Sequence, residues 1–284
     1  MRHLVKSISI ALRALASVSP RLAGRAAFFL FCRPMGRGAV REHERDLHER
    51  AERSVLEVDG NQVVVHRWGR GERPVLMVHG WGGRASRFAD TARALLDRGI
   101  PVIAFDAPGH GESSGSITHI LHFEEIIERL YKDVGAFGGI VAHSFGSLGV
   151  FKALRSGVET DRVVSVNGVC DFFHLLDVFA ERLGLGAEVE RDLRERSERL
   201  LASGDDIWDR FSVSHDPDLI RAPILVVQDE DDDVVDPEQA RRIVAAFAPR
   251  ARLVTTEKLG HRRVLHSDRV TSAVVGFLAD ERGR

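Results

Sequence analysis

The fold of this chain is decided by one stretch, Gly138-Gly139-Ile140-Val141-Ala142-His143-Ser144-Phe145-Gly146. A short apolar run ends at Ser144, and residues 147–154 behind it show the pattern of a helix. A strand, a sharp turn and a helix form the setting in which a serine becomes an exposed nucleophile. The small residues on either side, Ala142 and Gly146, suit a turn that is too tight for larger side chains. The alternative is a strand-to-helix connection whose serine only caps the helix. Residues 142–146 by themselves leave both interpretations open.

Length and composition suit one large α/β domain, or one such domain with an insertion. The chain has 284 residues, of which 44% are hydrophobic and 29% are charged. A formal net charge of −2 gives no electrostatic case for nucleic acid as a partner. Two cysteines, Cys32 and Cys170, argue against a disulfide framework and fit a reducing compartment, so the expected location is cytoplasmic.

The N-terminal segment, residues 1–31, is rich in Leu, Ala and Arg and allows two interpretations. Its apolar runs are interrupted by three arginines: Arg13, Arg21 and Arg25. A membrane span needs about 20 apolar residues, so none is expected. The apolar run after Lys6 stops at Arg13 and no clear small-residue cleavage site follows, so a signal peptide is not expected either. Four apolar residues fall on one face of a helix: Leu4, Ile8, Leu12 and Leu15. We favour a helix packed on the globular body; the alternative is a basic amphipathic helix that makes peripheral membrane contact.

Strand-like and helix-like patterns alternate along the rest of the chain. The Asp59-Gly60 pair predicts the turn of a β-hairpin between residues 55–58 and 63–66. Continuous apolar runs, typical of strands buried on both faces, occupy residues 74–79, 101–105, 163–166 and 224–227. Helical patterns lie around residues 88–96, 123–131 and 237–248, and before Leu278. This alternation predicts an α/β fold with a mostly parallel sheet and helices on both faces.

The order of these patterns divides the chain into three parts. Residues 33–53 are charged, lack strong periodicity and look like a connector, so residues 1–53 are expected to form an N-terminal helical, basic extension. The α/β core is expected over residues 54–170 and 220–284. Residues 171–219 carry Leu and Phe among many charges, with no obvious strand. This segment is therefore predicted to be a helical cap inserted into the core.

A reactive serine needs a base that accepts its proton, an acid that orients the base, and donors for the developing oxyanion. In chain order the sequence offers Ser144, an acidic cluster at residues 229–233, and His261, each after a predicted strand. Parallel strands bring such positions together at one edge of the sheet. Several carboxylates are candidates for the acid: Asp229, Asp231, Asp232, Asp233 and, after the preceding strand, Asp171.

Together these segments resemble the α/β-hydrolase fold serine hydrolases of the bacterial esterase and lipase-like kind. The resemblance runs from about Ser54 to the C-terminus and rests on five segments: His79-Gly80-Trp81-Gly82-Gly83, Asp106-Ala107-Pro108-Gly109-His110-Gly111, Ala142-His143-Ser144-Phe145-Gly146, Asp232 and Gly260-His261. Two residues depart from the family pattern. Ala142 stands in place of the usual glycine before the serine, and Asp229 stands in place of a glycine common ahead of the acid.

The resemblance implies an α/β-hydrolase fold and a carboxylesterase-like activity on a small-molecule acyl substrate. It makes Ser144 the nucleophile, His261 the base and Asp232 the residue that orients the base. The backbone N–H groups of Trp81 and Phe145 would form the oxyanion hole, and no cofactor is needed. A thioesterase, an amidase or a C–C hydrolase would use the same residues. A binding protein that kept the fold without activity is the alternative from a different class.

The residues around this centre are expected to form an apolar pocket. Leu and Phe residues of the cap are predicted to form one wall above Ser144, with Trp208 among them. His79 and His143 are placed beside the site as pocket residues, with bracing of the neighbouring loops as the alternative role. The wall predicts a preference for uncharged acyl groups.

Two further groups of polar residues are expected to be exposed. His119, His122 and Glu125 fall along one helix face and raise the question of a metal site. Exposed polar positions on an amphipathic helix explain the same spacing, so no metal is expected. Arg262 and Arg263, beside His261, are expected to point to solvent.

Overall fold

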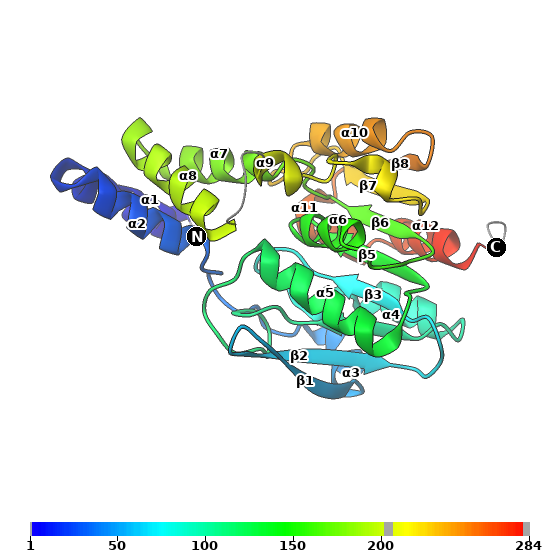
Figure 1. Ribbon diagram of the computed structural model, residues 1–284. Helices are drawn as coiled ribbons and strands as arrows, with labels where there is room; N and C mark the ends of the chain where they lie inside the picture. Colours follow the sequence, from blue (N-terminus) through cyan, green and yellow to red (C-terminus); the bar gives the residue numbers. More distant parts are fainter. Residues whose placement is uncertain (1, 202–206, 281–284) are drawn as a thin grey trace.

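An eight-stranded sheet forms the centre of the computed structural model, which describes residues 2–201 and 207–280 (Figure 1). The strand order is β1-β2-β4-β3-β5-β6-β7-β8. β1 and β2 form the predicted hairpin, β2 pairs antiparallel with β4, and all pairs from β4 to β8 are parallel. The strands are β1 (Glu52–Val58), β2 (Asn61–Trp68), β3 (Val75–Val78), β4 (Val102–Phe105), β5 (Gly139–His143), β6 (Val163–Val166), β7 (Ile224–Asp229) and β8 (Ala251–Thr256). The prediction of an α/β fold with a mostly parallel sheet is confirmed.

Helices cover both faces of the sheet, as predicted (Figure 1). The central strands β3, β4, β5 and β6 are buried along their whole length, because their side chains enter two separate apolar cores. One core contains residues of α5, α6 and α10, and the other contains residues of α3, α4 and α12. These helices are α3 (Glu42–Glu49), α4 (Ala89–Leu96), α5 (Ile120–Val134), α6 (Gly146–Arg155), α10 (Pro237–Ala246) and α12 (Asp268–Ala279).

The segment predicted to form a cap consists of helices in the part that the structure describes. α7 (Phe172–Leu183) begins at the N-cap Asp171, whose side chain accepts a hydrogen bond from the N–H of Phe173. It ends at Gly184, which adopts the left-handed conformation common at helix C-termini. α8 (Ala187–Leu201) and α9 (Ile207–Arg210) follow, and residues 202–206 lie outside the described residues.

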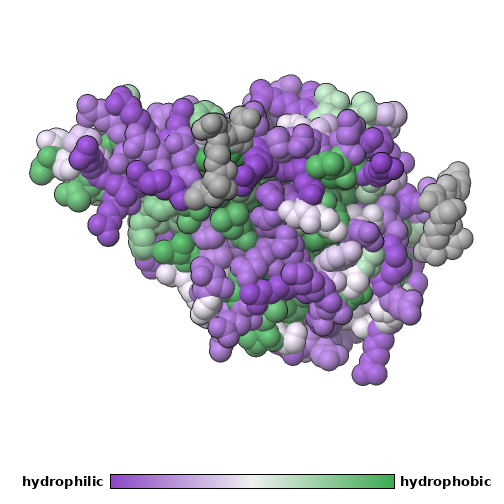
Figure 2. Space-filling view, in the orientation of Figure 1, coloured by the Kyte–Doolittle hydropathy of each residue, from purple (hydrophilic) through white to green (hydrophobic). Residues whose placement is uncertain are grey.

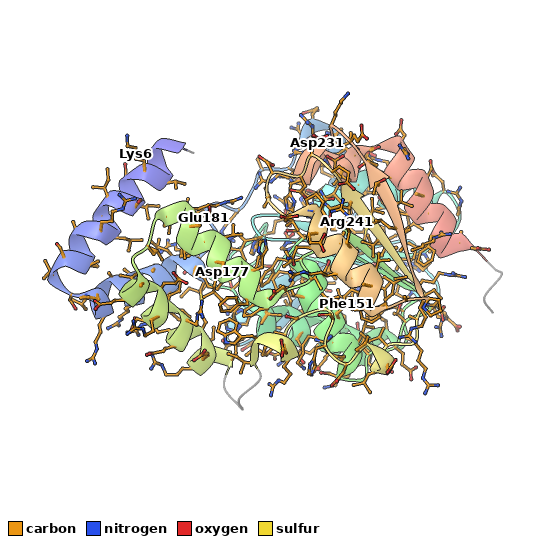
Figure 3. All side chains as sticks on the ribbon, turned by 90° about the horizontal axis from the view of Figure 1, so that it is seen from above. Lys6, Phe151, Asp177, Glu181, Asp231 and Arg241 are labelled. Atoms are coloured by element: carbon orange, nitrogen blue, oxygen red, sulfur yellow. The ribbon has the colours of Figure 1, made fainter. Side chains whose placement is uncertain are left out.

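The N-terminal segment forms a helical hairpin, α1 (Arg2–Val18) and α2 (Pro20–Phe31), that lies against the cap rather than the sheet (Figures 1 and 3). Ser19 caps α2 by accepting a hydrogen bond from the N–H of Leu22. Ser9 of α1 donates a hydrogen bond of 2.6 Å to the carbonyl of Leu183 in α7. A third apolar cluster joins the two units and contains Leu12, Ala23, Ala27, Leu183 and Val189. None of the helices within 2–201 and 207–280 has the length and apolar content needed to cross a bilayer.

The expected connector contains a helix, α3, that the sequence pattern did not predict. Its periodicity is weak because five of its eight residues are charged, two more are His43 and His48, and the remaining one is Leu47. The helix is held instead by the buried Glu44, whose carboxylate accepts hydrogen bonds from the hydroxyl of Ser86 and from Arg87. Such a long-range contact leaves no local signal. The remaining short helices are η1 (Ala85–Phe88), η2 (Pro217–Leu219), α11 (Gly260–Arg263) and η3 (Val264–His266).

Candidate active site

Ser144 occupies a sharp turn between β5 and α6. Its φ angle is 54°, in the left-handed region that non-glycine residues enter at a cost of about 1–3 kcal/mol. Hydrogen bonds fix this conformation: the N–H of Ser144 donates to the carbonyl of Val166 at 3.0 Å, and its own carbonyl accepts from the N–H of Ser147 at 3.0 Å. The turn places the serine at the carboxyl end of β5, as the sequence predicts.

Close packing explains why small residues surround this serine. A Cβ atom added to Gly146 would lie 2.7 Å from the carbonyl oxygens of Val78 and His79. A Cβ atom added to Gly80 would lie 2.7 Å from Cβ of Ser144. Ala142, which departs from the family pattern, is fully buried in β5 with its methyl group accommodated. The alanine therefore does not prevent the turn from forming.

The structure brings Asp232 and His261 together. Nδ1 of His261 lies 2.7 Å from Oδ2 of Asp232, whose side chain is completely buried. The other oxygen, Oδ1, accepts hydrogen bonds from the N–H groups of Val234 (2.8 Å) and Val235 (3.0 Å). The carboxylate is thus fixed from both sides, and an ionised acceptor next to Nδ1 places the ring proton there. Nε2 of His261 is then the nitrogen with a free lone pair.

The other candidate carboxylates have different partners. The carboxylate of Asp229 accepts hydrogen bonds from the backbone N–H groups of the two residues before His261. Oδ2 of Asp231 accepts a hydrogen bond from the N–H of Lys258 at 2.8 Å. Asp233 is exposed. Asp171 caps α7 and contacts Arg242 at 3.3 Å. Of the five carboxylates, the structure therefore places Asp232 in contact with the imidazole of His261.

His143 braces His261 from behind instead of lining a pocket. Nε2 of His143 lies 2.9 Å from the carbonyl oxygen of His261, and the two rings are 4.7 Å apart. Burial, reinforced by the neighbouring His261, lowers the pKa of His143 to about 3. The ring is therefore neutral at pH 7, with its proton on Nε2 to donate to that carbonyl. Asn167 Nδ2 reaches the same oxygen at 3.5 Å.

His79 and His110 organise the loop after β3. Nδ1 of His79 donates to the carbonyl of Gly80 at 2.8 Å, and its Nε2 accepts from the N–H of Ala107 at 3.0 Å. His110 accepts a hydrogen bond of 3.0 Å from the N–H of Gly82, and burial lowers its pKa to about 3, so it remains neutral. His110 was not predicted as a site residue, although it lies in one of the segments that carry the family resemblance.

The backbone N–H groups of Trp81 and Phe145 are available for a ligand. Within the described part of the chain, neither donates a hydrogen bond to another protein group. The two side chains pack edge to face with ring centroids 5.5 Å apart, which holds the loop of Trp81 next to the turn at Ser144. Two free N–H groups in this position are what an oxyanion hole requires.

A cavity of about 360 Å³ opens beside Ser144. Predicted cap residues form part of its wall, together with residues of α1 and α2 that the sequence did not place there. Its apolar lining comes mainly from Val5, Ile8, Phe28, Phe31, Ile120, Phe172, Leu175, Val178, Phe179, Leu183, Leu200, Leu201 and Val235. Three arginines also line it, Arg33, Arg182 and Arg262, and no Asp or Glu among residues 2–201 and 207–280 does. Arg262 is exposed, as expected, and it also borders this cavity.

Three predicted pocket residues lie outside this lining. Trp208 packs inside the cap: its ring lies 5.7 Å from that of Phe172, and its Nε1 donates to Glu198 at 3.1 Å. His79 and His143 are buried behind the loops that they brace. Local sequence does not reveal this difference, because it depends on which side of each loop faces the cavity.

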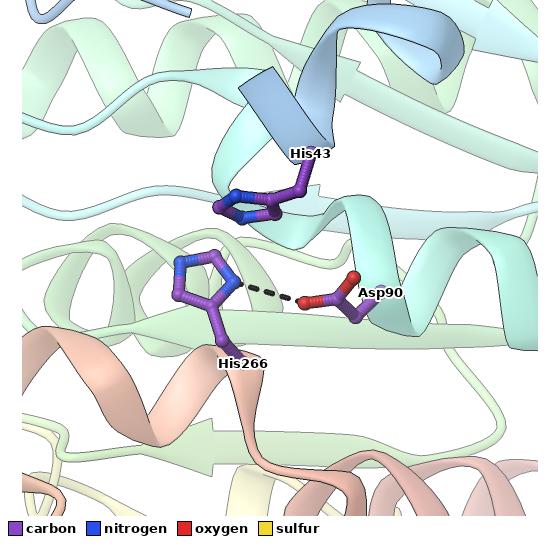
Figure 4. A group of neighbouring side chains, drawn as sticks. All are labelled: His43, Asp90 and His266. Atoms are coloured by element: carbon purple, nitrogen blue, oxygen red, sulfur yellow. Dashed lines mark hydrogen bonds and ion pairs between the residues drawn. The ribbon is translucent and has the colours of Figure 1, made fainter. Parts of the chain in front are cut away.

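Two clusters of His and Asp were tested as metal sites. In the first, His43, Asp90 and His266 converge, with Nδ1 of His266 3.0 Å from Asp90 (Figure 4). Nη1 of Arg41 lies 2.8 Å from the other nitrogen of His266, and Arg93 contacts Asp90 at 3.2 Å. These guanidinium groups occupy the positions a cation needs, so the cluster forms a hydrogen-bond chain and does not fit a metal.

The second cluster contains Asp59, His119 and His122. His122 is buried and its Nε2 lies 3.2 Å from Asp59, so the expectation that it occupies an exposed helix position is wrong. The two imidazole rings stack 3.8 Å apart, and burial lowers the pKa of His119 to about 4. These contacts account for the cluster without a bound ion.

Asp229 positions the loop that carries His261. Its carboxylate accepts hydrogen bonds from the N–H of Gly260 (2.8 Å), the hydroxyl of Thr256 (2.8 Å) and the N–H of Leu259 (3.2 Å). Burial alone would raise the pKa of Asp229, but these hydrogen bonds outweigh it and lower the pKa. A carboxylate at the position of the family's glycine thus has a structural explanation that the sequence did not provide.

The Asp229→Asn variant is expected to lose about 2 kcal/mol of folding free energy at pH 7, because an amide cannot accept all of these bonds. Since the folded-state pKa lies below the unfolded value of about 3.9, the carboxylate stabilises the fold above that pH and loses this effect as the pH falls through the folded-state pKa. Urea unfolding at pH 7 and at pH 3.5 measures the difference, which should shrink at the lower pH. Asp233→Asn, at an exposed position, is the control. Equal stability of Asp229→Asn and the wild type at pH 7 would contradict this role.

Comparison with known proteins agrees with the fold. The model of the alpha/beta hydrolase family matches residues 75–274. A non-heme chloroperoxidase from Kitasatospora aureofaciens is 39% identical over 56 residues, and the dihydrolipoyllysine-residue acetyltransferase component of an acetoin cleaving system from Cupriavidus necator is 33% identical over 93 residues. These matches cover 20% and 32% of this chain, and the chain spans only 20% and 25% of the two relatives.

Similarity to solved structures extends over most of the chain. A monoacylglycerol lipase from Paleococcus ferrophilus superposes with a TM-score of 0.59 at 21% identity, covering 76% of this chain and 98% of that one. At this identity the similarity shows the fold alone. The family match, in contrast, covers well over half of the sequence and includes Ser144, Asp232 and His261. The chain belongs to the alpha/beta hydrolase family.

Proposed function

We propose that the protein is a serine hydrolase that cleaves carboxylic esters through an acyl-enzyme. Oγ of Ser144 attacks the ester carbonyl while Nε2 of His261 accepts its proton, and the N–H groups of Trp81 and Phe145 bind the oxyanion. The C–O bond of the ester then breaks, and His261 returns the proton to the departing alkoxide. Water, deprotonated by His261, attacks the acyl-enzyme and releases the acid and free Ser144. The observation that carries the proposal is the 2.7 Å contact between Asp232 and Nδ1 of His261.

The lining of the cavity supports an acyl chain of several carbons as the preferred substrate group. Apolar side chains from α1, α2, α7 and α8 surround a volume of about 360 Å³ next to Ser144. Each methylene that moves from water into such a lining contributes about 0.8 kcal/mol. Longer acyl chains should therefore be bound more tightly in the transition state, up to the length that fills the cavity.

A chain-length series of p-nitrophenyl esters tests the proposed activity and its substrate group. We expect kcat/KM to rise at least about tenfold from the acetyl to the octanoyl ester. This rise is smaller than the one that complete transfer of six methylenes from water to the lining would give. Val178→Trp, which fills part of the cavity from α7, should shift the optimum toward shorter chains while hydrolysis of the acetyl ester persists. Fastest turnover of the acetyl ester by the wild type, with no change in Val178→Trp, would contradict a role of this cavity in binding the acyl group.

A further inference from the structure

The N-terminal part of the chain has a charge distribution unlike the rest. Residues 1–41 contain eight Lys or Arg residues and no Asp or Glu, whereas residues 42–284 carry a formal net charge of −10, which together give the −2 of the whole chain. Most of the positive segment forms the α1–α2 hairpin. The hairpin is therefore a strongly cationic unit on a slightly acidic protein.

The described cationic side chains of the hairpin form no ion pairs. Four of them are exposed: Lys6, Arg13, Arg21 and Arg25. Among residues 2–201 and 207–280, none of the four lies within ion-pair distance of a carboxylate. Lys6 projects from the side of α1 that faces away from the cap (Figure 3). These charges are thus free to interact with an external anionic surface.

Large apolar side chains are exposed on the same hairpin. Val18 is 82% exposed, Ile10 59% and Leu22 52%. Val18 and Leu22 flank the turn at Ser19 between the two helices, and hydrophobic atoms are visible at this projecting tip (Figure 2). Apolar side chains on a cationic helical surface, with no acidic residue among them, are the pattern of segments that lie in a membrane interface.

The inner side of the hairpin leads to the candidate active site. Val5 and Ile8 of α1 and Phe28 and Phe31 of α2 line the cavity that contains Ser144. The inner side of the hairpin therefore faces this cavity, and its outer side faces away from the cavity. A lipid surface bound to the outer face would therefore be separated from this cavity by the hairpin alone.

We propose that the α1–α2 hairpin docks the protein on an anionic lipid bilayer, with the tip around Val18 and Leu22 inserted between headgroups. The cations attract the anionic lipids, and the apolar tip adds the burial that holds the protein in the interface. A second copy of the chain is disfavoured as the partner of this face, because four positive charges without ion pairs would face four others. That the acyl substrate comes from the bilayer is a further step, and this step rests on the proposed function.

Vesicle flotation tests the docking without using hydrolysis as its readout. The full chain is mixed with vesicles of phosphatidylcholine alone, or of phosphatidylcholine with about one third phosphatidylglycerol, at low and high salt. We expect binding to the anionic vesicles that weakens at high salt. Arg21→Gln with Arg25→Gln should weaken it about 30-fold, which corresponds to about 1 kcal/mol for each lost cation. Val18→Ser with Leu22→Ser should weaken it at least about tenfold.

Matched controls lie elsewhere on the surface. Val55 and Leu219 are 62% and 63% exposed, and Arg70 and Arg98 are exposed arginines on the α/β domain. Val55→Ser with Leu219→Ser, and Arg70→Gln with Arg98→Gln, should leave vesicle binding unchanged. All of these variants should keep the wild-type activity on a soluble short-chain ester.

Ser144→Ala separates the two proposals, because it should float with anionic vesicles as the wild type does even though it cannot hydrolyse an ester. Docking without any ester hydrolysis by the wild type would overturn the proposed function alone. The docking would be overturned by equal binding to neutral and anionic vesicles, or by control pairs that lose as much binding as the hairpin variants. It would also be overturned if the protein did not float with vesicles and instead formed a dimer that Val18→Ser with Leu22→Ser dissociates.

Discussion

The Ser144→Ala variant is expected to fold normally and to lose at least about 10⁵-fold in kcat for ester hydrolysis. The hydroxyl is the attacking group, and neither His261 nor the N–H groups of Trp81 and Phe145 can replace it. Folding should be unaffected, because the φ angle of 54° is set by backbone hydrogen bonds that alanine keeps. Steady-state kinetics with the best ester of the chain-length series, together with circular dichroism and thermal unfolding, measure both quantities.

Ser54→Ala, at an exposed position of β1, is the matched control and should retain wild-type turnover. A fluorophosphonate probe should label the wild type and Ser54→Ala but not Ser144→Ala. Absence of labelling in the wild type would favour the alternative of a binding protein that kept the fold without activity. Turnover by Ser144→Ala within tenfold of the wild type would exclude the serine mechanism.

The Asp232→Asn variant is expected to lose about 10⁴-fold in kcat with its fold intact. The reason lies in the two hydrogen bonds that Oδ1 accepts from the N–H groups of Val234 and Val235. An asparagine must place its carbonyl oxygen there, so its NH₂ group faces Nδ1 of His261. The imidazole is then forced to carry its proton on Nε2, which removes the lone pair needed to accept the proton of Ser144.

Asp233→Asn is the control for this variant, because its side chain is exposed and is not bonded to His261. Its activity should stay within about twofold of the wild type. NMR of the imidazole protons in Asp232→Asn should show the proton on Nε2 at neutral pH, which a merely structural role of Asp232 would not produce. Wild-type turnover in Asp232→Asn would show that another group orients His261.

Most of the sheet could be predicted from the sequence, because its signals are local. Buried parallel strands are short, continuous apolar runs, and each helix that follows repeats its apolar residues every three or four positions. The Asp59-Gly60 turn likewise specifies its hairpin within a few residues. The α3 helix was missed because its stability comes from the buried Glu44, which interacts with η1 more than 40 residues away.

The sequence by itself determined the positions of Ser144 and His261, since each follows a strand at the same edge of a parallel sheet. It could not choose among the clustered aspartates from their chemistry, because neighbouring carboxylates are equivalent until the turn fixes the direction of each side chain. Only the tertiary structure directed Asp232 toward His261 and Asp229 toward the backbone of Gly260. Only the tertiary structure, too, placed α1 and α2 in the wall of the cavity, because contacts such as that of Ser9 with Leu183 join segments 174 residues apart and leave no trace in local periodicity.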